Sequence, residues 1–207
     1  MSRPSTDTDT GFAWQASLFG GDRPAIDRSF TAVTRTHLDP TAWLDVAPGW
    51  VSGADALFEV VLARAPWETH RVHMYERMVE QPRLTARWDD QPAVVDEMRA
   101  VLSDRYGVEF TSVGFNLYRD GRDSVAWHGD RVARELPEAV VAIVTLGGRR
   151  KFQLRPKGGG RSTTLWPASG DLMVMGGSCQ CTMDHCVPKM AAAEPRVSIQ
   201  FRHAYDG

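Results

Sequence analysis

The stretch Pro195-Arg196-Val197-Ser198-Ile199-Gln200-Phe201-Arg202 alternates polar and apolar residues, which is typical of a half-buried β-strand. Because successive side chains of a strand point to opposite faces, the polar ones share one face. This face consists of Arg196, Ser198, Gln200 and Arg202. Two buried arginines are costly unless an anion neutralises them, and a guanidinium fits a carboxylate with two parallel hydrogen bonds. We therefore expect this strand to bind an anion such as a dicarboxylate.

This strand is the last in the C-terminal half of the chain, and that half is rich in β-strand patterns. From Val108 onward, short apolar or alternating runs are separated by Gly, Pro and Asp, and they span residues 109–118, 124–130, 139–146, 151–155, 171–176 and 195–203. Residues 156–161 indicate a turn between two of these strands. We expect facing strands of this half to form a double-stranded β-helix, which is a jelly-roll core.

The first half of the chain carries two helix patterns. Ser52-Gly53-Ala54-Asp55 has the spacing of a capping box before an apolar run that starts at Leu57. Gln91-Pro92 opens a second run whose apolar residues repeat on one helical face as far as Leu102. Both helices are expected to buttress the sheet, so the predicted fold class is mainly β, an α+β architecture.

Length and composition fit one globular domain, because 207 residues with 43% hydrophobic content can fill a single core. We predict a disordered tail at 1–11 and one domain at 12–207, made of N-terminal helices and a lid at about 12–107 and the β core at about 108–203. The net charge of −2 argues against a globally basic nucleic-acid binder. No apolar run approaches the ~20 residues that span a bilayer, and no signal-peptide pattern opens the chain, so we expect a cytoplasmic monomer without membrane contact.

A second motif, His128-Gly129-Asp130, places an imidazole and a carboxylate two residues apart, so that both lie on one face of an extended strand. His185 from a neighbouring strand would complete a set of two histidines and one carboxylate. Such a set holds Fe(II) and leaves open positions for a co-substrate and O2. With the arginine strand, it makes 2-oxoglutarate the expected dicarboxylate. By itself His-x-Asp is a weak signal, since chance places it in many proteins.

Taken in order, these motifs resemble the AlkB family of Fe(II)/2-oxoglutarate-dependent dioxygenases, whose signature is Asn-x-Tyr, His-x-Asp, a distal His and Arg-x5-Arg. The corresponding residues are Asn116, Tyr118, His128, Asp130, His185, Arg196 and Arg202. The stretch from Tyr118 to His128 is similar to the bacterial branch of the family, and the resemblance runs from about Ser17 to Arg202.

The resemblance implies roles for these residues. The implied catalytic residues are His128, Asp130, His185 and Arg196, of which the first three are the metal ligands. The implied 2-oxoglutarate-binding residues are Asn116, Tyr118, Arg196, Ser198 and Arg202. Arg202 is expected to receive the far carboxylate of 2-oxoglutarate as a salt bridge, and Arg196 to hold the metal-proximal end.

The resemblance also implies an activity. Fe(II), 2-oxoglutarate and O2 would together hydroxylate an N-methyl group on a DNA base, which then leaves as formaldehyde, while 2-oxoglutarate becomes succinate and CO2. The family's default substrates are 1-methyladenine and 3-methylcytosine. Two departures leave the base and strand preference open: Val132 stands where several relatives carry an acidic residue, and Trp88-Asp89 replaces the usual aromatic-Gly pair.

Substrate contacts are implied by Met74-Tyr75-Glu76-Arg77 and by Pro82-Arg83-Leu84-Thr85-Ala86, which resemble the nucleotide-recognition lid of relatives that act on duplex DNA. Tyr75 would fill the gap left by a flipped base, and Arg83 would contact phosphate. The full expected set is Met74, Tyr75, Arg83, Trp88 and Trp127. The alternative is that Tyr75 and Trp88 only cap the core.

Several alternatives stay open at the level of sequence. The substrate could be alkylated single- or double-stranded DNA or RNA, or the chain could be a 2-oxoglutarate oxygenase for a small molecule or a protein side chain. A noncatalytic iron or 2-oxoglutarate sensor is a different class of function, which the intact ligand set disfavours. Cys179, Cys181 and Cys186 could join His185 in a zinc site, but their spacing is short for one, and packed thiols are expected.

Overall fold

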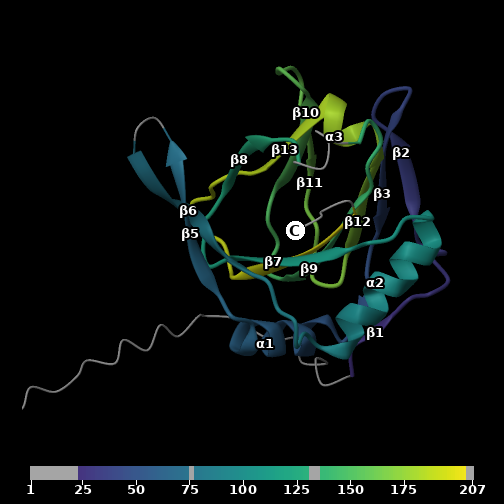
Figure 1. Cartoon of the computed structure of the whole chain (residues 1–207), viewed down its shortest axis with the longest axis vertical. Helices are drawn as coiled ribbons and strands as arrows, with labels where there is room; N and C mark the ends of the chain where they lie inside the picture. Colours follow the sequence, from purple (N-terminus) through teal and green to yellow (C-terminus); the bar gives the residue numbers. More distant parts are fainter. Residues whose placement is uncertain (1–22, 75–76, 131–135, 204–207) are drawn as a thin grey trace, which may run out of the picture.

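In a computed structural model of the chain, residues 23–74, 77–130 and 136–203 can be described (Figure 1). The predicted tail at 1–11 lies outside these residues. The helices are α1 (Ala54–Arg64), α2 (Ala93–Tyr106) and α3 (Cys179–Thr182). The strands are β1 (Ala25–Ile26), β2 (Thr34–His37), β3 (Ala42–Ala47), β4 (Val51–Ser52), β5 (Glu68–Met74), β6 (Arg77–Ala86), β7 (Ser112–Tyr118), β8 (Val125–His128), β9 (Val141–Gly147), β10 (Phe152–Pro156), β11 (Thr163–Leu165), β12 (Leu172–Gly177), β13 (Met183–Val187) and β14 (Arg196–Arg202).

Two antiparallel sheets form the body of the protein. The larger sheet has the strand order β2-β3-β12-β9-β14-β7-β6-β5, and the smaller one has the order β11-β10-β13-β8. In Figure 1, β8, β13 and β10 lie above the interior and β7 and β9 lie below it. One hydrophobic cluster, which includes Ile143, Phe152 and Met173, fills part of the space between the sheets. The predicted double-stranded β-helix is confirmed.

Strand β14 lies at the centre of the larger sheet, between β7 and β9. Its apolar residues Val197, Ile199 and Phe201 are fully buried in a second hydrophobic cluster together with residues of α1 and α2. Its polar residues face the smaller sheet, where they line a cavity. The predicted alternation is confirmed, but the expectation of a half-buried strand is wrong, because the second sheet covers the polar face as well.

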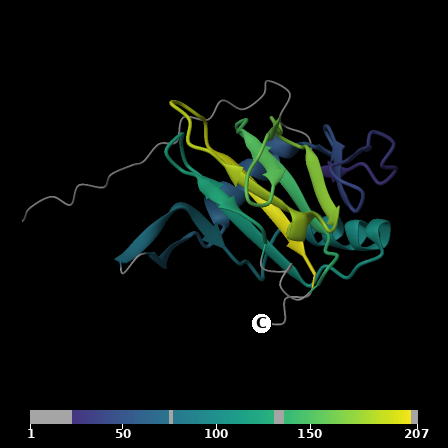
Figure 2. The same ribbon diagram turned by 90° about the horizontal axis from the view of Figure 1, so that it is seen from above.

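The two long helices cover the outer face of the larger sheet, as Figures 1 and 2 show. Helix α2 begins directly after Pro92, as predicted. The predicted capping box before α1 is wrong: Ser52 belongs to β4, where its hydroxyl donates to the carbonyl of Ala25, and the N-cap is Gly53 with a left-handed φ of 62°. Among the described residues, no helix combines the length and the apolar character needed to cross a membrane.

The first half of the chain holds more strand than predicted, since β1 to β6 all precede α2. Strand β3 pairs with β12, and β6 pairs with β7, so strands from this half flank the β core on both sides. The expected lid segments fall on the β5–β6 hairpin, which extends the larger sheet beyond β7. Polar edge strands such as β2, with every residue exposed, lack the apolar alternation by which strands are recognised.

Helix α1 offers a test of its packing against β9. Phe58 is 0% exposed, and a Cβ on Gly147 would come within 2.7 Å of its ring. We expect Phe58→Ala to lower the free energy of unfolding by about 3–5 kcal/mol, because truncation leaves a cavity in the core. Val60→Ala on the same helix is the matched control, since Val60 is 38% exposed, and we expect a change within about 0.5 kcal/mol. Equal denaturation midpoints for the two variants would contradict this packing.

Candidate metal and dicarboxylate site

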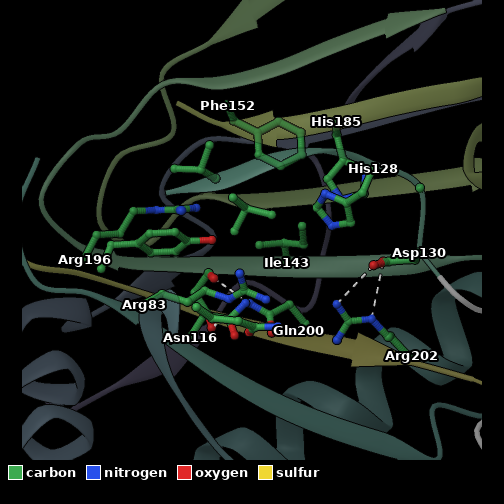
Figure 3. Close-up of a pocket in the computed structure, with 16 residues that line it drawn as sticks. Arg83, Asn116, His128, Asp130, Ile143, Phe152, His185, Arg196, Gln200 and Arg202 are labelled. Atoms are coloured by element: carbon green, nitrogen blue, oxygen red, sulfur yellow. Dashed lines mark hydrogen bonds and ion pairs between the residues drawn. The ribbon is translucent and has the colours of Figure 1, made fainter. Parts of the chain in front are cut away.

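Two histidines lie next to each other on neighbouring strands of the smaller sheet. His128 on β8 lies directly opposite His185 on β13 in the antiparallel register, so both imidazoles project from the same face. Their ring centroids are 4.3 Å apart. A carboxylate oxygen of Asp130 lies with one nitrogen of each histidine in a group whose atoms are all within 4.8 Å of one another. The predicted ligand set is therefore brought together at one point (Figure 3).

Local contacts orient both rings. The Nδ1 of His128 donates to the carbonyl of Ala126 at 2.8 Å, which leaves Nε2 as the free nitrogen. Metal-ligating histidines commonly hold their second nitrogen in this way. His185 stacks on Phe152, with centroids 5.5 Å apart and planes at 21°. Burial lowers the pKa of His185 to about 4, so its ring is neutral at neutral pH, as a metal ligand must be.

Asp130 is fixed from two sides. Its backbone N–H donates to Oε1 of buried Gln180 at 3.2 Å, and Arg202 donates to both of its carboxylate oxygens at 3.3 and 3.4 Å. Burial opposes ionisation of Asp130, but the charge of Arg202 outweighs it and holds the pKa of the carboxyl below its usual value. Two imidazole nitrogens and one carboxylate are a donor set that suits Fe(II).

A cavity of about 450 Å³ extends from these ligands between the two sheets. Its apolar wall consists of Val125, Ile143, Phe152 and Val187, and its polar wall includes all four polar residues of β14. Asn116 and Tyr118 on β7 also line it, directly opposite Ser198 and Arg196 in the register. The residues predicted to bind 2-oxoglutarate therefore line one cavity together with the predicted metal ligands.

Arg196 lies at the end of the cavity away from Asp130 (Figure 3). It is 1% exposed, and it donates to the hydroxyl of Thr145 at 3.0 Å, while its Nε finds no hydrogen-bond acceptor among the described residues. Burial lowers its pKa to about 10, which still leaves it charged at neutral pH. A buried cation that lines a cavity and has no carboxylate in contact is a candidate site for an anion.

The two arginines are therefore placed opposite to the sequence-based expectation. Arg202, expected at the far end of the co-substrate, forms an ion pair with Asp130 and so lies beside the metal ligands. Arg196, expected at the metal-proximal end, lies at the far end beside the ring of Tyr118. The expected division of roles is wrong in position, because strand alternation gives both arginines the same face but does not say which end of β14 meets β8 and β13.

Of the predicted substrate residues, Arg83 on β6 lines the cavity, and its Nε lacks a partner among the described residues. Trp88 is not among the cavity-lining residues, and its ring packs edge-on against Phe115 with 6.0 Å between the ring centroids, which agrees with the alternative that it caps the core. Trp127 does not line it either. Tyr75 lies outside the described residues, as do the side chain of Met74 and the position of Val132.

Trp127 lies outside the cavity although it directly precedes His128 on β8. Strand β8 is irregular at this point, because Val125 and His128 both line the cavity and the register with β13 shifts between them. The guanidinium of Arg155, on β10, lies 4.1 Å from the centre of its ring. Trp127 therefore belongs to the outer face of the sheet.

Four residues at the site were not predicted: Gln81, Thr145, Arg150 and Gln180. Gln81 lines the cavity, Thr145 contacts Arg196, and Gln180 holds the backbone of Asp130. Only Thr145 carried a usable signal, as a polar residue inside the apolar run 139–146. Gln180 lies in the four-residue helix α3 and Arg150 in the connection between β9 and β10, and neither segment is long enough to show a periodicity that would indicate side-chain direction.

The zinc alternative is not supported by the geometry. Asp184 and Cys186 flank His185 on β13 and therefore point to the opposite face. Cys179 and Cys186 are buried thiols, and Cys181 is partly buried. Within the described part of the chain, the group of potential ligands around His185 contains no cysteine. The expectation of packed thiols is confirmed for Cys179 and Cys186.

Fold and site together define a metal-dependent oxygenase of the jelly-roll type. The family described as the 2OG-Fe(II) oxygenase superfamily matches residues 52–202, and the chain belongs to this family. Fe(II), 2-oxoglutarate and O2 are accordingly its cofactor and co-substrates.

Relatives narrow the membership to the AlkB family, which confirms the resemblance seen in the sequence. The human protein named alpha-ketoglutarate-dependent dioxygenase alkB homolog 3 is 29% identical over 209 residues, which cover 87% of this chain and 72% of the human one. Its bovine counterpart is 28% identical, with coverage of 87% and 70%. The Arabidopsis thaliana protein named DNA oxidative demethylase ALKBH2 is 28% identical over 70% of this chain and 60% of its own length.

Solved structures support the fold. A 2OG-Fe(II) oxygenase family oxidoreductase from Burkholderia pseudomallei superposes with a TM-score of 0.55 at 16% identity, covering 77% of this chain and 84% of that one. OsALKBH1 superposes with a TM-score of 0.53 at 11% identity, covering 82% and 99%. At these identities the likeness concerns the fold alone.

The ligand set can be tested without turnover. We expect His185→Ala to weaken the binding of Fe(II), or of Mn(II) as a redox-inactive substitute, by more than about 100-fold. Loss of a residue that only contacts a metal ligand already lowers metal affinity by about 10–100-fold. His37→Ala is the matched control, because His37 lies exposed on the edge strand β2, and its metal affinity should equal that of the wild type. Calorimetric titration measures both, and equal affinities would remove His185 from the metal site.

Proposed function

We propose that this protein is an Fe(II)- and 2-oxoglutarate-dependent demethylase that removes N-alkyl lesions of the 1-methyladenine and 3-methylcytosine type from DNA. The observation that carries the proposal is the single cavity in which His128, Asp130 and His185 lie at one end and uncompensated Arg196 at the other. Support for the substrate class comes from the AlkB relatives and their names.

The co-substrate would lie along the polar face of β14. Arg196 is placed to take the distal carboxylate of 2-oxoglutarate, because its guanidinium is charged, buried and free of any carboxylate contact among the described residues. Tyr118 lines the cavity beside Arg196, and Asn116 adds polar groups one pleat further along β7. A dicarboxylate bound in this way would extend its oxo-acid end toward the metal ligands.

The remaining residues orient and shield the reacting end. Bound Fe(II) supplies the activation of O2 that converts 2-oxoglutarate to succinate and CO2 and hydroxylates a substrate C–H bond. Arg202 holds Asp130 ionised and in place, and the carbonyl of Ala126 fixes the ring of His128. The apolar wall formed by residues such as Ile143 and Phe152 limits water beside the metal ligands.

The substrate side of the proposal rests on Arg83 and Gln81, through which β6 contributes to the lining of the cavity. A base must leave its stack to reach a buried metal centre, and single strands release a base at lower cost than duplexes. A hydroxylated N-methyl group loses formaldehyde and restores the unmodified base.

We also propose that the protein acts on alkylated DNA as a monomer in the cytoplasm.

Formaldehyde release tests this function. With Fe(II), ascorbate and 2-oxoglutarate, we expect formaldehyde from a single-stranded DNA oligonucleotide that carries 1-methyladenine or 3-methylcytosine, and none with His128→Ala. Release from the equivalent methylated RNA alone would move the substrate to RNA. Succinate without formaldehyde from either nucleic acid would retain the oxygenase but contradict demethylation.

The placement of the two arginines gives a second test. We expect Arg196→Gln to raise the KM for 2-oxoglutarate by roughly 30-fold or more, which corresponds to the lower end of the about 2–5 kcal/mol lost when one partner of a buried charge pair is truncated. Arg202→Gln should mainly weaken metal binding, because its partner is Asp130. Arg99→Gln on α2, whose side chain is 44% exposed, is the control. An unchanged KM for Arg196→Gln, with a large rise for Arg202→Gln, would reverse the assignment.

A further inference from the structure

Arg150 is a fully buried arginine that does not line the cavity. It is 0% exposed and lies in the connection between β9 and β10. The centre of its guanidinium is 5.6 Å from the centroid of the Tyr118 ring, and that of Arg196 is 5.4 Å from the same centroid. Tyr118 therefore contacts two buried cations.

The guanidinium of Arg150 is held by backbone carbonyls. It donates through Nη1 to Asp120 at 2.5 Å and through Nη2 to Asp123 and Pro188 at 2.6 and 3.3 Å. These carbonyls belong to two separate connections, one between β7 and β8 and one between β13 and β14. Arg150 thus ties the segment that follows Tyr118 to the segment that follows the strand of His185.

The charge of Arg150 is not neutralised by an ion pair among the described residues. The nearest acidic groups are engaged elsewhere: the carboxylate of Asp123 accepts from Arg119, and that of Asp120 accepts from Arg122. A buried cation is costly unless an anion or several dipoles stabilise it. Here the dipoles of the backbone carbonyls and the face of the Tyr118 ring stabilise the charge of Arg150.

We propose that Arg150 is a positioning residue for the co-substrate, which fixes Tyr118 and adds a second positive charge behind the cavity end occupied by Arg196. This inference rests on the proposed use of 2-oxoglutarate. The second charge strengthens the positive potential at this end without occupying space in the cavity, because low dielectric lets a buried charge act beyond its own contacts. Arg150 therefore favours 2-oxo acids that carry a distal carboxylate over those that end in a methyl group.

Binding to the Mn(II)-loaded protein tests the inference without turnover. Calorimetry gives the dissociation constants of 2-oxoglutarate and of 2-oxopentanoate, which has the same chain length but no distal carboxylate, and their ratio is the selectivity. We expect Arg150→Met to lower this ratio by about tenfold or more. Arg149→Met is the matched control, because it removes the same charge from the exposed neighbouring position, and its ratio should equal that of the wild type.

A lysine variant separates charge from packing. Arg150→Lys keeps the charge but cannot reach all three carbonyls, so we expect a lower melting temperature with a ratio within about threefold of the wild type. A tenfold loss of the ratio in Arg150→Lys would overturn the role of charge even if Arg150→Met does not fold. Equal weakening of both ligands in Arg150→Met would reduce Arg150 to a structural residue. Wild-type protein that binds neither 2-oxo acid would instead overturn the proposed function itself.

Discussion

The burial of β14 on both faces is the constraint on which the rest of the structure depends. Its apolar face is covered by α1 and α2, and its polar face is covered by the smaller sheet. Polar groups that are buried must find partners. The two sheets cannot close over Arg196, Ser198 and Gln200 as an apolar core would, so they leave a cavity there. The same packing that stabilises the jelly roll therefore produces a polar pocket beside the metal ligands.

The buried charges of the two arginines of β14 are stabilised in different ways. Arg202 finds its counter-charge within the protein, in Asp130, whereas Arg196 finds only a hydroxyl and an aromatic ring. Six residues of extended strand separate their Cα atoms by roughly 20 Å, so the two side chains lie at opposite ends of the cavity and do not share one partner. One arginine serves the metal site, and the other leaves a charge for a ligand to neutralise.

Sequence alone predicted the parts of the site that follow from strand alternation. The shared face of β14 depends on a period of two, which a single chain displays, and the runs predicted after Val108 correspond to β7, β8, β9, β10, β12 and β14. The predicted strand 124–130 is too long, because β8 ends at His128, and Asp130 joins the two histidines from the connection that follows it. The order of the arginines depends on the register between strands far apart in sequence. Trp127 was expected at the site because it is next to His128, but the irregular register of β8 with β13 is not visible in the sequence, and its ring lies against Arg155 instead.

Arg150 shows why segments between strands contribute what periodicity cannot predict. It stands in a short connection with no alternation, yet it is as buried as the centre of the core. Its charged side chain can be buried there because three backbone carbonyls from two other connections accept hydrogen bonds from it. Such convergence exists only once the jelly roll has brought the ends of β7 and β13 together. The positive end of the cavity is therefore a product of the whole topology, assembled behind Tyr118 by residues that no single motif contains.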